Sequence, residues 1–551
     1  MKHTGLKLFV LFIPLSFLFS CAQNQEKKEV QKPNIVIFFS DEMRPVAVSP
    51  YGRTQPTPTI GKLADEGAVF NNAYCSSAMC TPSRYTMMTG NFAGRCQAED
   101  FLKSNPKNEP YTIAWNTHLS EKDKTIAEYL RDEGYYTGFV GKYHMGGDKT
   151  LTTFPEFEGE VDPYDPEVNS RLQNYQKSLQ EYVKKVTGFD YAASVLWANY
   201  EQNPIPEHCF HNFEWMTKGA IDFLEEAGDE PFFLYTATTA LHGPPHHKAL
   251  DLDPHVTPAG LLENPAEFHP SREELRQRLI DNGFDVTHHN VGLAMLDDHV
   301  AAVLQKLEEL EKTENTLVIF VADHGVEPGK ASCYEVGLKI PLIVRWPGIT
   351  EPGSKIDQNT QIVDLLPTTL DAAGSPLPEN AVDGMSFLSA LKGEEVKGRK
   401  YLYFENGYSR AVSDGTYKFM TLRYPERIIQ DMKDGKHEYA PNHLDFPMQP
   451  NAQVAIVYHP HYFDQNQLYN YVEDYWEQNN LIDDPELQEK VAELKEELRR
   501  QVEKFDHPYP LQNQEYLETE EFRELTKKTY ALGTDFIYWW DPKTRELPPG
   551  Y

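Results

Sequence analysis

Five short apolar runs in the first 350 residues constrain the fold of this chain more than any other feature. They are continuous rather than alternating with polar residues, which is typical of strands buried on both faces of a parallel sheet. A sheet of this kind needs helices to cover both of its faces. The runs are NIVIFFS (34–40), YTGFVG (136–141), FFLYTA (232–237), LVIFVA (317–322) and PLIVRW (341–346).

Segments with helical patterns lie between these runs. TPTIGKLADEG (57–67) has Thr57 at the N-cap, Pro58 at the first helical position and a glycine as a stop, and KTIAEYLRDEG (124–134) ends in the same way. HNVGLAMLDDHVAAVLQKLEELEK (289–312) is long and amphipathic. The alternation of strands and helices predicts a doubly wound α/β domain with a large, mostly parallel sheet flanked by helices.

The pattern changes after residue 395. Residues 401–424 are typical of antiparallel strands, 467–481 of a loop, and 486–505 of an amphipathic helix docked on a sheet. We therefore expect a main domain over 33–395 and a smaller α+β subdomain with a short antiparallel sheet over 396–551.

The N-terminus has the pattern of a targeting segment. Two lysines precede an apolar run at 8–19, which is too short to span a bilayer, and Ser20-Cys21 follows it. This resembles a bacterial lipobox, which implies a lipoprotein signal peptide over 1–20 and lipidation of Cys21. Residues 21–32 would then be a polar tether to the outer membrane, with the body on its periplasmic or cell-surface face. An ordinary secretory signal is the alternative.

The charge balance excludes a general nucleic-acid binder. The 551 residues include 84 acidic and 52 basic side chains, a net charge of −32, whereas nucleic-acid binding needs a basic face. An anionic substrate would be repelled at long range, so it would need a local cationic pocket or a bound metal.

Charged groups and imidazoles follow four of the apolar runs. Ligands of doubly wound sheets bind beyond the carboxyl ends of the strands, so we expect these groups to meet at one edge. In chain order they are Asp41 and Glu42, then Lys142 and His144, then His242, His246 and His247, and finally Asp323 and His324.

These residue types predict an anion site that contains a metal. Carboxylates are hard oxygen ligands and suit Ca²⁺ or Mg²⁺ better than zinc. Arg84 and Lys142 are cations that hold a tetrahedral anion, and a helix opening near Pro82 directs backbone N–H groups to the same place. His144 and His242 can move protons near neutral pH. A sulfate or phosphate ester is the expected ligand.

Cys80, in AMCTPSRYTMMTG (78–90), leaves four interpretations open. It is half of a disulfide, a metal ligand, a thiolate nucleophile, or the precursor of a modified residue. The six cysteines include no C-x-x-C pair and no zinc spacing, and nothing specific supports a disulfide.

C-T-P-S-R at 80–84, with T-G at 89–90, resembles the signature of the type I, formylglycine-dependent sulfatases of the alkaline-phosphatase-like superfamily. The resemblance implies an alkaline-phosphatase-like α/β sandwich and a sulfuric ester hydrolase. Further motifs follow in the family's order: PNIVIFFSD (33–41), GKYHMG (141–146), ADHG (322–325), GKASCYEVGLKIPLIVRWPG (329–348) and LYNYVEDYWEQNNL (468–481).

The resemblance also implies a chemistry for Cys80. A formylglycine-generating enzyme or an anaerobic maturase would oxidise it to Cα-formylglycine (3-oxoalanine). One hydroxyl of the hydrated aldehyde attacks sulfur and expels the alcohol; the other is then deprotonated, and sulfate leaves as the aldehyde is restored.

Roles for the remaining site residues follow from the same resemblance. Arg84 and His144 would orient and activate the diol, and Lys142 and Lys330 would bind sulfate oxygens. His242 would contact sulfate and is the candidate acid for the leaving alcohol. The metal ligands, for Ca²⁺ or secondarily Mg²⁺, would be Asp41, Glu42, Asp323, His324 and the oxygen that replaces the sulfur of Cys80.

The sequence says less about the substrate than about the sulfate site. A lipid-anchored sulfatase suggests polysaccharide degradation, so a sulfated glycan is expected, either algal, such as ulvan, fucoidan or carrageenan, or a host glycosaminoglycan. A phosphodiester or phosphonate monoester hydrolase and a non-catalytic glycan-binding lipoprotein are the alternatives. Candidate glycan-contacting side chains are Trp197, Tyr200, Trp215, Tyr424, Tyr439 and His443.

The remaining histidines divide into two groups. His246 and His247 either line the substrate subsite or have no part in it. Surface or capping positions are expected for His118, His208, His211, His288 and His289.

Overall fold

The structure is a computed structural model, in which the chain divides into two units. Its two units are Met1–Gln31 and Lys32–Tyr551, and the second holds every helix and strand described. The predicted signal peptide and Cys21 lie outside the described residues. No described helix is long and apolar enough to span a membrane. The described residues are 1, 32–52, 54–147, 155–157, 161–200, 205, 208–265, 269–378, 380–394, 398–436 and 455–534.

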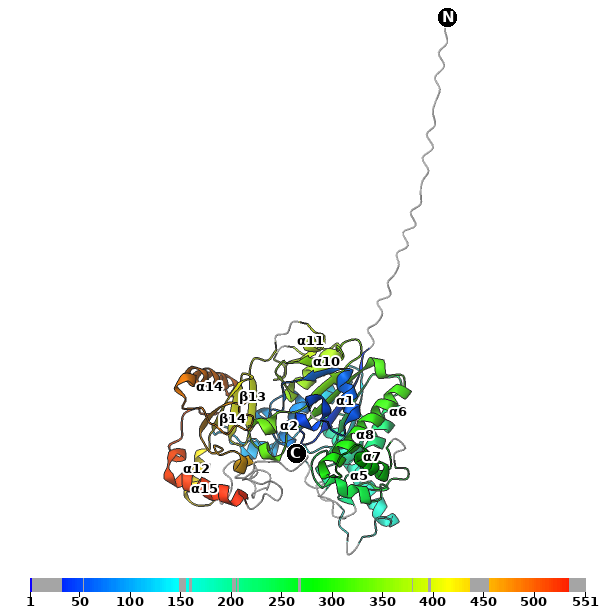
Figure 1. Cartoon of the computed structure of the whole chain (residues 1–551), viewed down its shortest axis with the longest axis horizontal. Helices are drawn as coiled ribbons and strands as arrows, with labels where there is room; N and C mark the ends of the chain where they lie inside the picture. The colour runs from blue at the N-terminus through cyan, green and yellow to red at the C-terminus, as the bar shows by residue number, and fades with distance from the viewer. Residues whose placement is uncertain are drawn as a thin grey trace. The chain divides into compact units, whose positions relative to one another are not determined.

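An eight-stranded, mostly parallel sheet forms the centre of the second unit (Figure 1). Each of the five predicted strands is present, which confirms the expected fold class. Shorter strands that the sequence pattern did not single out, such as AVF and SKI, complete the sheet. The strands in spatial order are β11 (Ser354–Ile356), β2 (Ala68–Phe70), β10 (Leu342–Arg345), β9 (Thr316–Ala322), β1 (Asn34–Ser40), β6 (Phe232–Ala237), β4 (Tyr136–Lys142) and β5 (Tyr191–Leu196).

One strand corrects the sequence-based expectation. β10 was expected to be parallel, but it runs antiparallel to both β9 and β2. Between β9 and β10 the chain has only a short 3-10 turn and the four-residue helix α9 (Glu335–Leu338). These 19 residues, 323–341, are enough for a crossover, but they contain no helix long enough to carry the chain across the sheet, so it turns back at the edge where β9 ends.

Helices cover both faces of the sheet, as the apolar strands require. Phe38 packs edge-on against His299 of α8 (His288–Glu309), while the neighbouring Phe39 lies under Arg84 of α2 (Cys80–Thr89). Successive strand residues point to opposite faces, so α8 and α2 lie on different sides. The contacts place α1 (Pro58–Asp65) and α6 (Phe213–Glu226) with α8, and α4 (Ile126–Asp132) and α10 (Leu365–Ala372) with α2.

The predicted helices at 57–67, 124–134 and 289–312 are present as α1, α4 and α8. The start of α1 differs in one detail. Thr57 is the N-cap residue, but its side chain makes no hydrogen bond to the first turn. Instead, Asp297 of α8 accepts hydrogen bonds from the backbone N–H groups of Thr59 (3.0 Å) and Ile60 (2.8 Å). A carboxylate at a helix N-terminus is stabilising, and here it joins two helices.

A second, antiparallel sheet follows the first along the chain. The expected strands in 401–424 are confirmed. The prediction of a loop at 467–481 was wrong for its first residues, because they belong to the edge strand of this sheet. The predicted helix at 486–505 is α14 (Gln488–Val502), and it packs on β14 and β15. The strands are β13 (Leu402–Asn406), β14 (Ser409–Ser413), β15 (Tyr417–Leu422) and β16 (Asn466–Asn470).

Further helices lie in the connections between these elements. They are α3 (Glu99–Ser104), α5 (Pro166–Thr187), α7 (Arg272–Asp281), α11 (Leu388–Leu391), α12 (Glu426–Lys433) and α15 (Glu520–Thr534).

Candidate active site

Strand register brings the predicted carboxylates together. β1 and β9 are parallel neighbours in which Ser40 pairs with Ala322, so the next residues, Asp41 and Asp323, lie side by side beyond the carboxyl ends. The backbone N–H of Glu42 donates to Asp323 Oδ1 at 3.1 Å and ties the two strand ends together. The sheet edge that the sequence predicted is thus where these groups meet.

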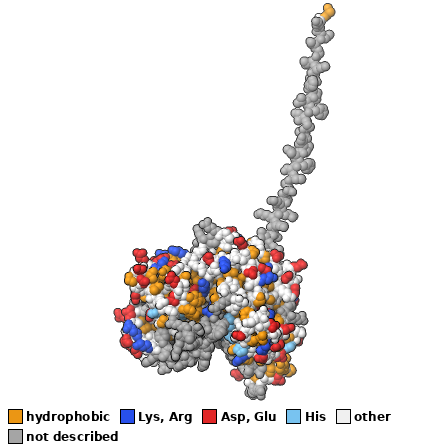
Figure 2. Space-filling view, viewed as in Figure 1, with side chains coloured by type: hydrophobic (Ala, Val, Ile, Leu, Met, Phe, Trp, Pro, Cys, Tyr) orange, Lys and Arg blue, Asp and Glu red, His pale blue; other side chains and the backbone are white. Residues whose placement is uncertain are grey.

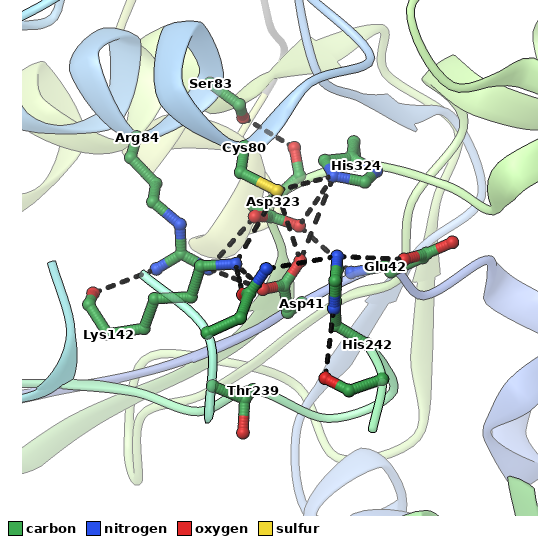
Figure 3. A network of polar contacts seen from close by, with 12 residues as sticks. Asp41, Glu42, Cys80, Ser83, Arg84, Lys142, Thr239, His242, Asp323 and His324 are labelled. Carbon is green, nitrogen blue, oxygen red and sulfur yellow. Dashed lines mark hydrogen bonds and ion pairs between the residues drawn. The ribbon is translucent and has the colours of Figure 1, made fainter. Parts of the chain in front are cut away.

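Helix α2 brings Cys80 to this edge as its first residue (Figure 3). The Sγ atom lies 3.2 Å from His324 Nε2 and 3.5 Å from Asp41 Oδ1. Ser83, in the same turn, donates from its hydroxyl to the backbone carbonyl of Asp323 at 2.5 Å. The helix start is therefore fixed directly to the end of β9.

The ammonium of Lys142, the last residue of β4, has acceptors on three sides. It donates to Asp41 Oδ2, to Asn199 Oδ1 at 2.6 Å and to Cys80 Sγ at 3.7 Å. An ammonium has three hydrogens, so these contacts use all of them.

Arg84 lies one helical turn after Cys80, on the same face of α2. Its guanidinium donates to Asp323 Oδ2 at 2.9 Å and to the backbone carbonyl of Lys142 at 3.1 Å, and it lies 3.4 Å from Asp41 Oδ2. Burial by itself would raise the pKa of Asp41, but Lys142 and Arg84 outweigh it and hold that pKa well below its usual value. Asp41 is therefore ionised.

Four side chains can hold a metal ion. Ligand atoms of Asp41, Cys80, Asp323 and His324 all lie within 4.8 Å of one another, and all four residues are buried. His324 Nδ1 donates to the carbonyl of Gly325 at 2.6 Å, which leaves the Nε2 lone pair directed at the cluster. Two carboxylates and one such imidazole fit a divalent cation.

Glu42, the fourth side chain predicted as a metal ligand, has partners next to the cluster. Its Oε2 accepts from Lys330 at 3.1 Å and lies 3.9 Å from His242 Nε2, and Glu42 is absent from the four-residue cluster among the described residues. Its backbone is left-handed, with φ of +54°, which turns the side chain away from the path of β1.

The environment of Cys80 argues against two of its four interpretations, a disulfide and a thiolate nucleophile. The five described cysteines are free. Burial, reinforced by the charge of Asp41, raises the pKa of the Cys80 thiol well above its usual value, and Lys142 offsets this only in part. A thiol in that state supplies little thiolate, so the surroundings do not suit a cysteine nucleophile.

The two predicted proton-transfer histidines are both neutral. Burial lowers the pKa of His144, and Lys142 and Arg84 lower it further; burial, Lys330 and Lys142 do the same to His242. The ring of His144 stacks on Trp115 with 5.4 Å between ring centroids.

The residues of the main sheet match a known family model. Residues 33–375 match the model described as Sulfatase, and residues 324–436 match the one described as N-sulphoglucosamine sulphohydrolase, C-terminal. The first match covers more than half of the chain. The chain belongs to the sulfatase family.

Two of the curated relatives of this sulfatase are named for sulfated carbohydrates. An N-acetylgalactosamine-6-O-sulfatase of Bacteroides thetaiotaomicron is 27% identical over 496 residues, covering 76% of this chain and 89% of the relative. An ulvan-active sulfatase of Formosa agariphila is 25% identical over 472 residues, covering 83% and 77%.

Solved structures share the fold of this sulfatase. A protein in complex with its substrate D-glucosamine-2-N,6-O-disulfate has a TM-score of 0.56 at 18% identity, covering 88% of this chain and 100% of that one. A phosphonate monoester hydrolase of Agrobacterium radiobacter has a TM-score of 0.52 at 16% identity, covering 86% and 96%. At these identities the likeness concerns the fold alone, which sulfate and phosphonate hydrolases share.

Several histidines of the sulfatase lie deeper than predicted. His208, His211 and His289 are buried, so they do not occupy surface positions. His246 is fully buried as well; it stacks on His211 at 3.6 Å and bonds to His288 Nδ1 at 3.0 Å. These rings form a packed layer beside the loop that carries His242.

Most of the aromatic side chains expected to contact glycan belong to the core. Trp197, Tyr200, Trp215 and Tyr424 are at most 9% exposed, so they pack against protein rather than a sugar. The prediction of glycan contacts rested on the position of these residues in long loops. An aromatic residue in a loop packs inward as readily as one in a strand, so this position does not indicate exposure. Tyr439 and His443 lie outside the described residues.

Sequence reasoning missed three residues beside the predicted ones. Ser83 had a signal, since it stands within C-T-P-S-R. Trp115 packs next to Met79 and Ala331, the chain neighbours of Cys80 and Lys330, and no motif marks it. Asn199 touches Lys142 and His242, also without a motif.

Proposed function

We propose that the chain hydrolyses sulfate esters of a sulfated carbohydrate, with formylglycine at position 80 as nucleophile and Ca²⁺ as the metal. The observation that carries this proposal is the convergence on Cys80 Sγ of His324, Asp41 and Lys142 at the start of α2. In the mature protein the aldehyde-derived hydroxyls would stand where the sulfur lies here.

The cations of the site supply what the anionic group of a sulfate ester needs. Figure 2 shows acidic side chains spread over the visible face with basic ones between them, and the chain is strongly acidic overall. Arg84, Lys142 and Lys330 are instead buried at one edge, at most 1% exposed. Buried positive charge attracts a tetrahedral anion and neutralises charge that develops on its oxygens in the transition state.

The remaining groups have roles that their positions support. A bound metal would polarise a sulfate oxygen and lower the pKa of a coordinated hydroxyl. Asp41, Asp323 and His324 would hold it, while Glu42, paired with Lys330, is the less suited ligand. Neutral His144, whose charged neighbours include Lys142 and Arg84, would accept a proton from the diol, and His242, beside Glu42 and Asn199, would face the leaving alcohol.

The relatives support the substrate class. Both act by name on sulfated carbohydrate, one on N-acetylgalactosamine 6-sulfate and one on ulvan. We propose a polysaccharide-derived oligosaccharide as substrate, a maturase as partner during biogenesis, and a lipid anchor at Cys21 that places the enzyme at the outer membrane. No observation in the site favours phosphodiester or phosphonate hydrolysis.

The test is desulfation measured across a panel of defined sulfated oligosaccharides, with phosphodiesters and phosphonate monoesters in parallel. The protein is co-expressed with a maturase, and mass spectrometry of the peptide containing residue 80 reports the modification. We expect sulfate release from at least one glycan class, with little phosphate or phosphonate turnover. Faster phosphodiester cleavage, or full activity with unmodified Cys80, would contradict the proposal.

A further inference from the structure

Asn199 lies between two residues that the proposed function assigns to sulfate. Its Oδ1 accepts a hydrogen bond from Lys142 Nζ at 2.6 Å, and its Nδ2 lies 3.4 Å from His242 Nε2. The remaining imidazole nitrogen, His242 Nδ1, lies 3.1 Å from the carbonyl of Gly243. The four groups form a chain that runs from the end of β4 to the loop after β6.

The direction of each bond in this chain follows from the first. An ammonium can only donate, so the amide oxygen of Asn199 must face Lys142 and the amide nitrogen must face His242. An amide nitrogen can only donate, so His242 Nε2 must accept and carries no proton. The single proton of the neutral imidazole is then on Nδ1, where the Gly243 carbonyl accepts it.

The backbone holds Asn199 firmly in this position. At the end of β5, the carbonyls of Leu196, its last residue, and of Trp197 accept hydrogen bonds from the N–H groups of Tyr143 and His144, each at 2.8 Å. The pairing of β4 and β5 therefore continues past the end of both strands. The ring of Trp197 is packed against Tyr143, with 5.5 Å between centroids. Asn199 follows two residues later, so Lys142 and Asn199 are placed by the same backbone segment.

We propose that Asn199 is a positioning residue that fixes the tautomer of His242, with the proton on Nδ1 and the lone pair of Nε2 accepting from the amide of Asn199. This inference rests on the proposed function only for the place of His242 beside the substrate. It changes the expected role of that residue. His242 would enter each turnover able to accept a proton at Nε2, and it would have none to give to the leaving alcohol until it had gained one.

The tautomer can be observed without any substrate. The full chain, with Cys80 left unmodified, is labelled with ¹⁵N-histidine, and two-bond ¹H–¹⁵N correlation spectra distinguish a protonated ring nitrogen from one with a lone pair. His242→Ala identifies the signals of His242. We expect Nε2 of His242 to show the lone-pair signature. A proton on Nε2 in the wild-type protein would overturn the proposal.

Two variants test whether Asn199 is the cause. In Asn199→Asp both side-chain oxygens can only accept hydrogen bonds. One oxygen still accepts from Lys142, and the other can bond to His242 only if Nε2 carries the proton. We therefore expect the tautomer of His242 to reverse. In Asn199→Leu the fixed preference is lost, and we expect a mixture of the two forms. Asn282→Asp, at the exposed end of α7, is the matched control and should leave the His242 signals unchanged. If the ring-nitrogen signals of His242 were the same in both Asn199 variants as in the wild-type protein, the proposal would be overturned.

Activity gives an independent measurement on the mature enzyme. We expect Asn199→Leu to lower kcat for a nitrophenyl sulfate by about 10- to 100-fold, the usual cost of losing a partner that orients a site group, with a smaller change in KM. Asn199→Asp should lower kcat as well, because His242 then presents N–H where a lone pair is needed. If the chain showed no sulfatase activity, the proposed function would fail while the spectra still decided the tautomer.

Discussion

Two regions of the molecule bury charges of both signs, and they do so in different ways. One is the edge of the large sheet around Cys80. The other lies against the antiparallel sheet, where Lys418 of β15 is 2.9 Å from Glu477 Oε1 and 3.4 Å from Glu335 Oε2. Their side chains are at most 1% exposed. Burial and charge alone therefore do not tell the two regions apart.

The difference is in where the polar groups point. In the Lys418 cluster they are directed at one another: the Glu335 N–H donates to Glu477 Oε2 at 2.6 Å, and the hydroxyl of Tyr74 donates to Glu335 Oε1 at 3.0 Å. Around Cys80 they converge instead on one reactive position at the start of a helix. A closed network maintains structure, whereas a convergent one is prepared for a ligand.

The largest effect that sharpens this comparison is expected at Cys80. Cys80→Ser, made in a host that modifies only cysteine, should lower kcat by about 10⁶-fold, the scale of removing a catalytic nucleophile. The melting temperature should hardly change, since Ser is smaller and the contacts of Arg84 and Asp323 remain. Sulfate release and calorimetry on the same preparation measure the two quantities. Retained turnover would place the nucleophile elsewhere.

The next effect is expected in the closed network and concerns stability. Lys418→Met leaves Glu335 and Glu477 buried without their cation, which typically costs about 3–5 kcal/mol in the free energy of unfolding. Denaturant unfolding measures this loss, and kcat of the folded protein should stay within about twofold. A variant that also carries Glu335→Gln and Glu477→Gln should recover much of the stability, because no charge remains unpaired. Loss of kcat with unchanged stability would reverse the assignment of the two regions.

The smallest effect is a pH dependence from Glu477. Burial raises its pKa to about 7, and the attraction of Lys418 offsets this only in part. The folded protein therefore binds this proton more tightly than the unfolded chain, whose Glu pKa is about 4.3. Its contribution to stability is complete below that value and is lost as the pH rises through 7, and between pH 5 and 8 the loss is on the order of 3 kcal/mol. Glu477→Gln should remove this decline between pH 5 and 8 in unfolding experiments; an unchanged decline would assign it to other groups.

The sequence predicted the parts of the site that depend on strand order. Asp41, Lys142 and Asp323 end or follow continuous apolar runs, and such runs determine both the sheet and the edge at which it binds ligands. It did not predict contacts that depend on side-chain direction. Glu42 is adjacent to Asp41 in sequence, yet its left-handed backbone leads it to Lys330. Asn199 lies in no motif, because its role comes from a backbone pairing that continues beyond β5.

The buried histidines illustrate the same limit. Nothing in the sequence around His211 distinguishes a surface ring from a buried one, but its two nitrogens have partners in Thr239 and the carbonyl of Pro244, each at 2.8 Å. Such matched partners offset the cost of burying a polar ring. They come from distant segments, so periodicity cannot reveal them.

Because β1 pairs with β9, the site contains residues that are synthesised at widely separated times. Cys80 and His324 are in contact although 244 residues separate them along the chain. At the usual 5–20 residues per second, synthesis of that interval takes about 10–50 s. During most of this period Cys80 has been synthesised, but Asp323 and His324, which later help to enclose it, have not. In the finished fold the thiol is inaccessible to solvent, so an enzyme that oxidises it would have to act on the growing or newly released chain.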